Sequence, residues 1–338
     1  MSKKIETVLI GTSLTEASDQ VVRAGLKIAQ AAKARVVLAH AFSSPVVYGG
    51  TPYLPQLPEM EEAQKERLLR KMEEQARLLG IRPEERAGMF LDLGPAHQML
   101  IATAQTVNAD LIVVGAAEEP ILAKLLGSTA DRVLRRATCP VLVVRRELSM
   151  PPARVLFPVD LSLLSAEAVH EGLEILGLLP RGRGPEAALP EVEALYVITE
   201  LDRHLFAPEE APERAELKIR EDLGHFLAVH AADNPFEVVP RVVSGYVEDE
   251  ILMRIHAWQP DLVILGTHGR HGFERFLLGS VATRVVHNGE ANVLIVPPAA
   301  AREQAEARSF AARGLAWKAS AASPDAVAEP LLSPVGAE

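Results

Sequence analysis

An internal repeat, with the second copy shifted by about 150 residues, is the feature that most constrains how this chain folds. The run Asp110–Gly115 (DLIVVG) returns as Asp261–Gly266 (DLVILG). Three shorter matches keep the same order: Val8–Ile10 with Val155–Phe157, Gly127–Ser128 with Gly279–Ser280, and Val141–Val144 with Val293–Val296. The spacings also agree, because 14 residues separate Gly127 from Val141 and Gly279 from Val293. The 338 residues are therefore expected to form two domains derived from one ancestral domain.

Each copy alternates short apolar runs with longer amphipathic stretches. Ten β-branched runs without polar alternation are expected to be strands buried on both faces: Thr7–Ile10, Val36–Phe42, Ala87–Leu91, Leu111–Val114, Val141–Val144, Arg154–Val159, Ala194–Ile198, Val238–Val243, Leu262–Leu265 and Val293–Val296. Helix patterns lie between them, as in Gln20–Ala32, Glu61–Leu79, Ala96–Val107 and Thr129–Arg136. This order predicts an α/β fold with two tandem five-stranded parallel sheets covered by helices. Such sheets bind ligands at the carboxyl ends of their strands.

Composition removes several classes of function. The formal net charge is −10, so the chain lacks the basic excess on which nonspecific nucleic-acid binding depends, and no nucleic-acid partner is expected. No apolar stretch reaches the roughly 18 residues of a membrane-spanning helix, and Met1–Thr7 lacks the shape of a signal peptide. The single cysteine, Cys139, lies in an apolar run and is expected in the core. We expect a cytoplasmic protein without a membrane partner.

The copies divide the chain into a first domain over residues 1–147, a second over 154–298 and a tail over 299–338. The joint is Arg145–Ala153, which contains Met150-Pro-Pro-Ala. Loops rich in Pro or Gly are expected at Ser43–Pro58 and Gly177–Pro190. The tail is rich in Ala, then in Pro and Ser, so we expect it to be partly disordered.

The fourth strand of the second copy leads into a loop of the form G-x2-G-x9-G-S, from Gly266 to Ser280. Glycines let backbone N–H groups approach a phosphate, and consecutive N–H groups form an anion-binding nest. Ser280 is expected to be the N-cap of the following helix, Val281–His287, beside the positive end of its dipole. His268, Arg270, His271 and Arg275 add positive charge nearby. No Lys follows the last glycine, so this is not a Walker loop.

This loop, its place after the fourth strand and the repeated five-strand pattern resemble the universal stress protein family, over nearly all of residues 1–298. The resemblance implies a Rossmann-like sheet of the adenine nucleotide α-hydrolase type. It also implies ATP as the ligand, alone or with Mg²⁺, and dimerisation through the fifth strands. In this chain the strands Val141–Val144 and Val293–Val296 can pair with each other, which would make an internal pseudo-dimer. A further homodimer stays open.

The resemblance also assigns ligand contacts to positions of the second copy. Asp160 would face the ribose, Pro158 and Val159 would line the nucleoside pocket, and the backbone of Val197 would meet the adenine edge. The residues expected to hold phosphates are Gly266, Gly269, Gly279, Ser280 and Val281, with Arg270 as a further cofactor-binding candidate.

The first copy departs from this pattern, so we expect it not to bind ATP. Ser13 stands in place of Asp160, and Glu118, followed by Glu119, in place of Gly269. A carboxylate about 5 Å from a phosphate charge costs roughly 3 kcal/mol at an effective dielectric near 20, which cancels one or two phosphate contacts. The segment Ser128–Asp131 also reads as an approximate capping box that would satisfy its own helix terminus.

Plainer interpretations remain for each feature. The glycine loop could be a structural turn, Asp160 could cap a helix as Ser162 could, and Arg270 could be solvated. The histidines have no metal-like spacing, and no nucleophile–base set is visible, so neither a metal site nor catalytic residues are expected. Three functions stay open: an ATP-responsive stress or signalling protein, a weak ATPase or autophosphorylating protein that needs a partner, and a nucleotide-free scaffold.

Overall fold

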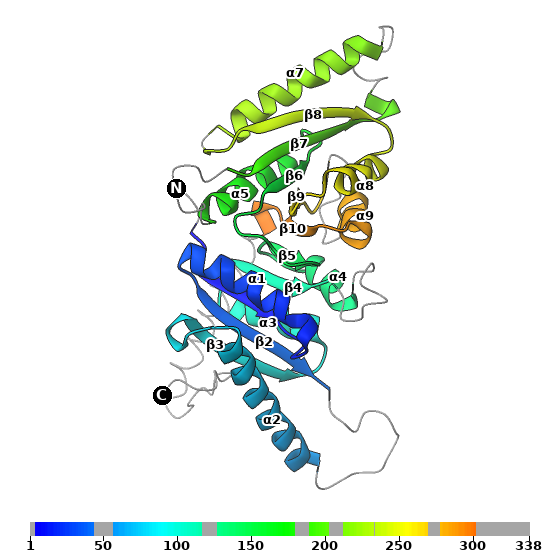
Figure 1. Cartoon of the computed structure of the whole chain (residues 1–338). Coiled ribbons are helices and arrows are strands. Elements are labelled where there is room, and N and C mark those ends of the chain that lie inside the picture. The colour runs from blue at the N-terminus through cyan, green and yellow to red at the C-terminus, as the bar shows by residue number, and fades with distance from the viewer. Residues whose placement is uncertain are drawn as a thin grey trace, which may run out of the picture.

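A single ten-stranded sheet runs through the molecule in the order β3-β2-β1-β4-β5-β10-β9-β6-β7-β8 (Figure 1). The structure is a computed structural model that describes residues 4–43, 57–116, 127–179, 189–202, 212–232, 234–269 and 278–301. Within each half the strands are parallel, which confirms the expected fold class of two tandem parallel-sheet domains.

The first half of the sheet contains the strands β1 (Thr7–Gly11), β2 (Arg35–Phe42), β3 (Arg86–Leu93), β4 (Leu111–Gly115) and β5 (Val141–Val144). Its helices are α1 (Glu16–Ala32), α2 (Leu57–Leu78), α3 (Ala96–Thr106) and α4 (Ser128–Leu134), and the 3-10 turn η1 (Pro83–Glu85) precedes β3.

The second half repeats this order with the strands β6 (Arg154–Pro158), β7 (Glu191–Ile198), β8 (Val238–Ser244), β9 (Leu262–Gly266) and β10 (Asn292–Val296). Its helices are α5 (Leu163–Leu178), α7 (Pro212–His230), α8 (Val247–Trp258) and α9 (Ser280–Asn288). Each of the ten expected apolar runs overlaps one strand. The bulk of the tail, of the loop Ser43–Pro58 and of the loop Gly177–Pro190 lies outside the described residues.

The strand β7 begins three residues before its expected apolar run and contains a buried carboxylate there. β7 begins at Glu191 rather than Ala194, and Glu193 within it is only 4% exposed. Its carboxylate accepts from Arg254 Nε at 2.8 Å and pairs with Arg241 Nε at 2.9 Å. Two guanidinium groups compensate the desolvation of the acid, so a polar residue occupies a position that periodicity reserves for apolar ones.

Two hydrophobic cores, one on each face of the sheet, run through both halves. The first lies under α1, α2, α5 and α7 and includes Ile10, Met72, Phe157 and Leu223. The second lies under α3, α4, α8 and α9 and includes Leu100, Val133, Ile255 and Val285. Cys139 is buried in the second core, as expected. Because both faces are covered, the strands read as continuous apolar runs.

Equivalent glycines bring α1 and α5 close to the sheet. A Cβ added at Gly25 would lie 2.5 Å from Ile10 Cδ1, and one added at Gly172 would lie 2.7 Å from both Phe157 Cε1 and Ile264 Cγ2. These distances are far below van der Waals contact, so each helix can pack at its observed distance only with glycine at the contact.

We expect Gly172→Ala to lower the free energy of unfolding by about 1–3 kcal/mol, because the added methyl group overpacks a closed core. Urea denaturation followed by circular dichroism measures this. Gly177→Ala is the matched control, since Gly177 lies on the same helix with nothing within 4 Å of its added Cβ. The control should be neutral or slightly stabilising. Equal losses in both variants would contradict the packing explanation.

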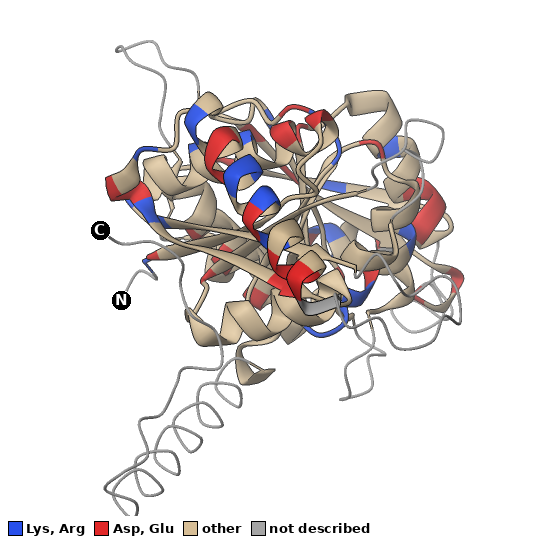
Figure 2. Ribbon diagram, turned by 90° about the horizontal axis from the view of Figure 1, so that it is seen from below, with Lys and Arg blue, Asp and Glu red and all other residues tan. Residues whose placement is uncertain are grey.

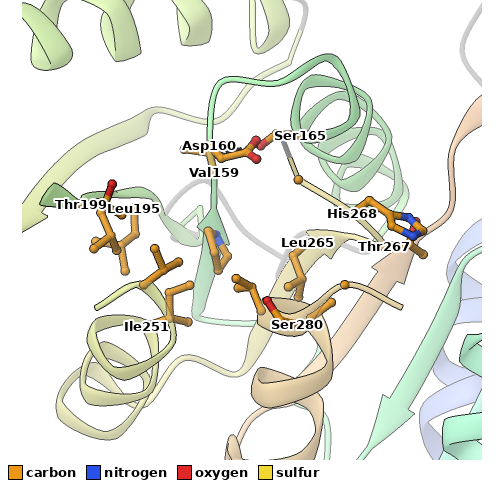
Figure 3. A pocket seen from close by; sticks show the side chains of 18 of the residues that line it. Val159, Asp160, Ser165, Leu195, Thr199, Ile251, Leu265, Thr267, His268 and Ser280 are labelled. Carbon is orange, nitrogen blue, oxygen red and sulfur yellow. Dashed lines mark hydrogen bonds between the residues drawn. The ribbon is translucent and has the colours of Figure 1, made fainter. Parts of the chain in front are cut away.

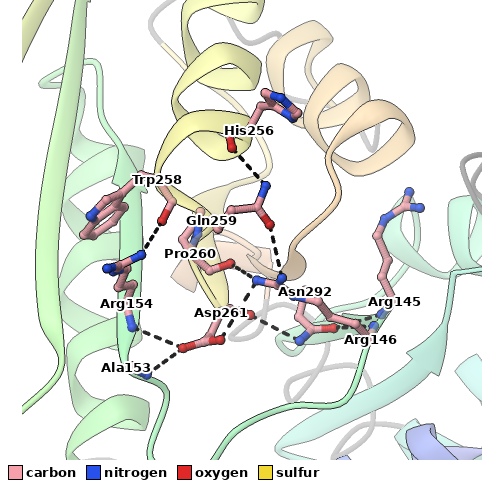
Figure 4. Close-up of polar contacts among 10 residues, drawn as sticks. All are labelled: Arg145, Arg146, Ala153, Arg154, His256, Trp258, Gln259, Pro260, Asp261 and Asn292. Atoms are coloured by element: carbon pink, nitrogen blue, oxygen red, sulfur yellow. Dashed lines mark hydrogen bonds and ion pairs between the residues drawn. The ribbon is translucent and has the colours of Figure 1, made fainter.

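The two halves join where β5 and β10 pair antiparallel, with Leu142 opposite Leu294. This is the internal pairing of fifth strands expected from the sequence, and it leaves β3 and β8 as the outer edges of the sheet (Figure 1). The buried side chain of Asn292 fastens the joint (Figure 4). Its oxygen accepts from the backbone N–H of Arg145 at 2.8 Å and of Arg146 at 3.2 Å, and its amide donates to Asp261 O at 3.2 Å.

In the view of Figure 2, charged residues of both signs are interspersed over the described helices. Among the described residues, no helix is long and apolar enough to cross a membrane.

Candidate functional site

A cavity of about 300 Å³ opens at the carboxyl ends of β6, β7 and β9 in the second half of the sheet (Figure 3). Four segments that are distant in the sequence line it: the turn after β6, the end of β7, the start of α8, and the glycine loop with the first turn of α9. Its volume lies at the lower end of the range typical for small-molecule sites. The cavity occupies the edge of the sheet where parallel α/β folds bind ligands.

The turn after β6 places Asp160 on this cavity. Leu161 takes a left-handed backbone conformation with φ of 62°, and the equivalent Leu14 of the first half takes φ of 60°. A non-glycine residue rarely adopts this region, so both halves keep the same unusual turn. In the second half, Asp160 Oδ1 accepts from the N–H of Ser162 at 3.0 Å and from its hydroxyl at 2.6 Å.

The helix cap belongs to Ser162 and not to Asp160. The Ser162 hydroxyl accepts from the N–H of Ser165 at 3.2 Å, which is the N-cap bond of α5. The half-buried carboxylate of Asp160 lies beside the cavity, and its Oδ2 faces Gly269, where an added Cβ would lie 2.4 Å away. The acid and the glycine loop are therefore in direct contact.

Two further glycines of this loop also lie close to neighbouring backbone. An added Cβ would lie 3.3 Å from Leu164 O at Gly266 and 3.0 Å from Thr267 O at Gly279. The described ends of the loop are tied by a hydrogen bond from Gly279 N to Thr267 O of 2.7 Å. Backbone this close to its neighbours leaves no room for side chains at these positions of the cavity wall.

The first turn of α9 completes that wall. Its first intrahelical bond runs from Thr283 N to Gly279 O at 2.8 Å, so the N–H groups of Ser280, Val281 and Ala282 precede the hydrogen-bonded ladder. Gly279 is the N-cap of this helix and Ser280 is its first helical residue, which corrects the expectation that Ser280 caps it. The cap residue is a glycine because Gly279 is also the point of close approach to Thr267 O.

Nine of the ten expected ligand residues line this one cavity: Pro158, Val159, Asp160, Val197, Gly266, Gly269, Gly279, Ser280 and Val281. Arg270 lies outside the described residues, as do His271 and Arg275. His268 also lines the cavity, and its Nδ1 is hydrogen-bonded to Thr267 Oγ1 at 2.9 Å.

The apolar end of the cavity contains residues that the sequence analysis did not single out. Leu195 lies on the same strand face as Val197, two positions earlier, and Val247 and Ile251 lie one turn apart on α8. Alternation on the strand and the i, i+4 spacing on the helix could have identified them.

Asp202 was also missed. It is 3% exposed and closes a turn with Thr199, because its Oδ2 accepts from the Thr199 N–H at 2.9 Å and from the Thr199 hydroxyl at 2.8 Å. The motif T-x-x-D directly after a strand was the available signal.

The first half retains a cavity at the equivalent place, of about 340 Å³, between the turn after β1 and the start of α4. Ser13 occupies the position of Asp160, Ala116 that of Thr267, and Ala39 that of Leu195. Glu118 and Glu119 lie outside the described residues. Loss of the acid has not closed this cavity.

The expected capping box at Ser128–Asp131 is wrong. Gly127 is the N-cap of α4 and receives no side-chain cap bond. Asp131 instead accepts from Arg135 Nε at 2.9 Å, and it meets the ring of His287, in the other half of the chain, at 3.4 Å. Partial burial would raise the pKa of the Asp131 carboxyl, but the hydrogen bonds and charge of Arg135 and His287 outweigh it and lower the pKa. The carboxylate of Asp131 therefore pairs with Arg135, one turn further along α4, and with His287 across the joint, and not with the backbone N–H groups of its own helix terminus.

Comparison with known proteins agrees with the fold and the repeat. The family model described as "Universal stress protein family" matches twice in tandem, at residues 4–145 and 152–297. The Universal stress protein A homolog 1 of Coxiella burnetii is 32% identical over 138 residues, which are 40% of this chain and 94% of that protein. A universal stress protein of Mycolicibacterium smegmatis is 26% identical over 305 residues, 86% of this chain and 97% of the relative.

A solved structure shows the same fold along most of the chain. The crystal structure of a universal stress protein from Archaeoglobus fulgidus aligns with a TM-score of 0.57 at 17% identity. The alignment covers 86% of this chain and 98% of that protein's chain. The two tandem matches of the family model, together with this fold, show that the chain belongs to the universal stress protein family.

Proposed function

We propose that this chain is an adenine-nucleotide-binding universal stress protein with one ATP site, in the second domain, whose occupancy governs a stress or signalling response. The observation that carries the proposal is the cavity in which Asp160 and three closely packed glycines, Gly266, Gly269 and Gly279, meet. An acid that accepts from ribose hydroxyls and N–H groups that face phosphates are the two kinds of contact that a nucleotide needs.

The distribution of apolar and polar residues in the lining supports one orientation of such a ligand. The base would lie between Leu195, Val197 and Ile251, which are apolar, and the ribose beside Asp160. The phosphates would lie toward the glycines and the N-terminus of α9, where the helix dipole favours negative charge. A bound Mg²⁺ would neutralise part of the phosphate charge, and Asp160 and the glycine backbone would keep their roles with or without it.

The first domain lacks features of the site in the second domain, which supports a stoichiometry of one nucleotide per chain. Its cavity has Ser13 where the second has Asp160, and the sequence carries Glu118 where the second has Gly269. Isothermal titration of the full chain with ATP, ADP, AMP and cyclic AMP tests the proposal, together with mass spectrometry of small molecules released on denaturation. We expect one site per chain. Two equal sites would refute the asymmetry, and no binding at millimolar nucleotide would refute the function and favour a nucleotide-free scaffold.

Asp160→Asn should weaken ATP binding about tenfold or more, because a charge-assisted hydrogen bond to a ribose hydroxyl contributes about 1.5–3 kcal/mol. Asn retains an oxygen that can accept from Ser162, so the turn should stay intact. The matched control is the ligand 2′,3′-dideoxy-ATP, which lacks both hydroxyls. Wild type and Asp160→Asn should bind it equally, and an unchanged ratio between the two proteins for both ligands would exclude a ribose contact.

A further inference from the structure

We propose that the cavity of the first domain is a second, separate ligand site, which takes an uncharged and largely apolar small molecule with one hydroxyl or carbonyl group. The cavity measures about 340 Å³ and lies between the turn after β1, the carboxyl end of β2, α3 and the first turn of α4. The inference concerns a ligand class different from the nucleotide proposed for the second domain, and it holds whether or not that proposal does.

The side chains that β2 contributes to this cavity are smaller than those that β7 contributes to the cavity of the second domain. Ala39 and Ala41 on β2 stand where Leu195 and Val197 stand on β7, and the register confirms the match, since Ala39 pairs with Gly11 as Leu195 pairs with Pro158. A domain that needed no ligand would gain stability from larger apolar side chains here. The smaller ones instead leave a wider apolar floor.

Part of the cavity wall is aliphatic. Met99 and Leu100 of α3, which are 6% and 2% exposed, and Val114 of β4 belong to the second core, and Val21 of α1 belongs to the first. Methionine adapts its shape to different apolar partners. Aliphatic side chains at the wall favour the apolar part of a ligand, because burying it removes apolar surface from water.

Charge distinguishes the two cavities. The described residues that line the second-domain cavity include Asp160, Asp202 and His268, whereas those that line the first-domain cavity include no ionisable side chain. A charged ligand group would lose hydration there without an ionisable side chain of the described lining to pair with.

Three side-chain hydroxyls at this cavity, those of Thr12, Ser13 and Ser18, already have partners within the chain. The Thr12 hydroxyl donates to Gln75 Oε1 at 2.8 Å and is hydrogen-bonded to Ser18 Oγ at 2.9 Å. The Ser13 hydroxyl is hydrogen-bonded to Thr15 Oγ1 at 2.8 Å. The hydroxyls of Ser128 and Thr129 also line the cavity and can each donate or accept. Two hydroxyl groups of this kind suit a ligand with a single hydroxyl or carbonyl group.

The test uses a matched pair of probes, 1-naphthol and 1-naphthoate, which share a ring system and differ in charge at pH 7. The full chain, with ¹³C-labelled methionine methyl groups, is titrated with each probe, and Met99→Leu assigns the Met99 signal. We expect 1-naphthol to shift the Met99 methyl signal saturably, also in the presence of saturating ATP. We expect 1-naphthoate to bind at least tenfold more weakly.

Ala39→Leu restores the side chain of the second domain and should reduce 1-naphthol affinity at least tenfold, whereas Gly269→Gln, at the other cavity, should leave it unchanged. Circular dichroism checks that each variant is folded. If Ala39→Leu does not fold, the test rests on how the Met99 signal of the wild type responds to the two probes. No Met99 shift up to millimolar 1-naphthol, equal binding of both probes, or unchanged affinity in folded Ala39→Leu would each overturn the proposal.

Discussion

Gly269→Glu should weaken ATP binding by the full chain about 100-fold or more. The new side chain would begin 2.4 Å from Asp160 Oδ2, so either the loop or the acid must move. Its carboxylate would then lie near the phosphates, where a like charge at about 5 Å costs roughly 3 kcal/mol at an effective dielectric near 20. The variant carries the residue that the sequence places at the equivalent position of the first domain, Glu118. Isothermal titration calorimetry measures the loss.

Two controls separate charge from shape and from a general effect of the substitution. Gly269→Gln has the same size without the charge, so it should bind ATP more tightly than Gly269→Glu and more weakly than wild type. Gly224→Glu adds the same charge on α7, where nothing lies within 4 Å of an added Cβ, and should bind as wild type does. Wild-type affinity in Gly269→Glu would show that the glycine loop does not hold phosphate.

Asn292→Leu should lower the free energy of unfolding by about 3 kcal/mol. The leucine has a similar volume but cannot accept from the N–H groups of Arg145 and Arg146 or donate to Asp261 O. Position 292 is fully buried, so these backbone groups would lose their partner where water does not replace it, and each such loss costs about 1–3 kcal/mol. The midpoint of urea denaturation, followed by circular dichroism, measures the change.

Asn288→Leu is the control for this substitution, because Asn288 is the exposed last residue of α9. Its effect should stay within about 0.5 kcal/mol. Unlike Asn288, Asn292 links β10 by a hydrogen bond to the segment that follows β5. A stability change no larger than that of the control would show that the joint does not depend on these hydrogen bonds.

The same joint connects the cavities of the two domains. α9 begins at Ser280 on one cavity and presents His287 near its other end, and α4 begins at Ser128 on the other cavity and carries Asp131. The ring of His287 meets Asp131 Oδ1 at 3.4 Å, and the Arg145 side chain donates to Val286 O and His287 O. Each cavity is therefore bounded by a helix that contacts the opposite domain.

The strands were predictable because burial on both faces makes them continuous apolar runs, as in Leu111–Val114 and Leu262–Leu265. The ends of the strands were less predictable. The strand β7 begins at Glu191 and contains the buried Glu193, whose partners Arg241 and Arg254 are about 50 to 60 residues away. A pattern read along the chain does not reveal a distant partner that makes a buried charge tolerable.

For the cavity, the glycine loop and Asp160 were recognisable because their chemistry is contained in short segments. The cap assignments were wrong because they depend on competition: Gly279 rather than Ser280 caps α9, and Asp131 pairs with Arg135 and His287 instead of its own helix terminus. Thr199 and Asp202 reach the cavity only through the pairing of β7 with β6.

From the sequence alone came the repeat, the ten strands and the difference between an intact glycine loop and one that carries glutamates. These features depend on composition and spacing within a few residues, which the chain expresses locally. The tertiary structure decided that β5 and β10 pair within one chain, and that the first domain keeps a cavity although it has lost the acid. A cavity is the volume left between Ala39, Met99 and Ala116, which lie on separate elements, so only their packing determines it.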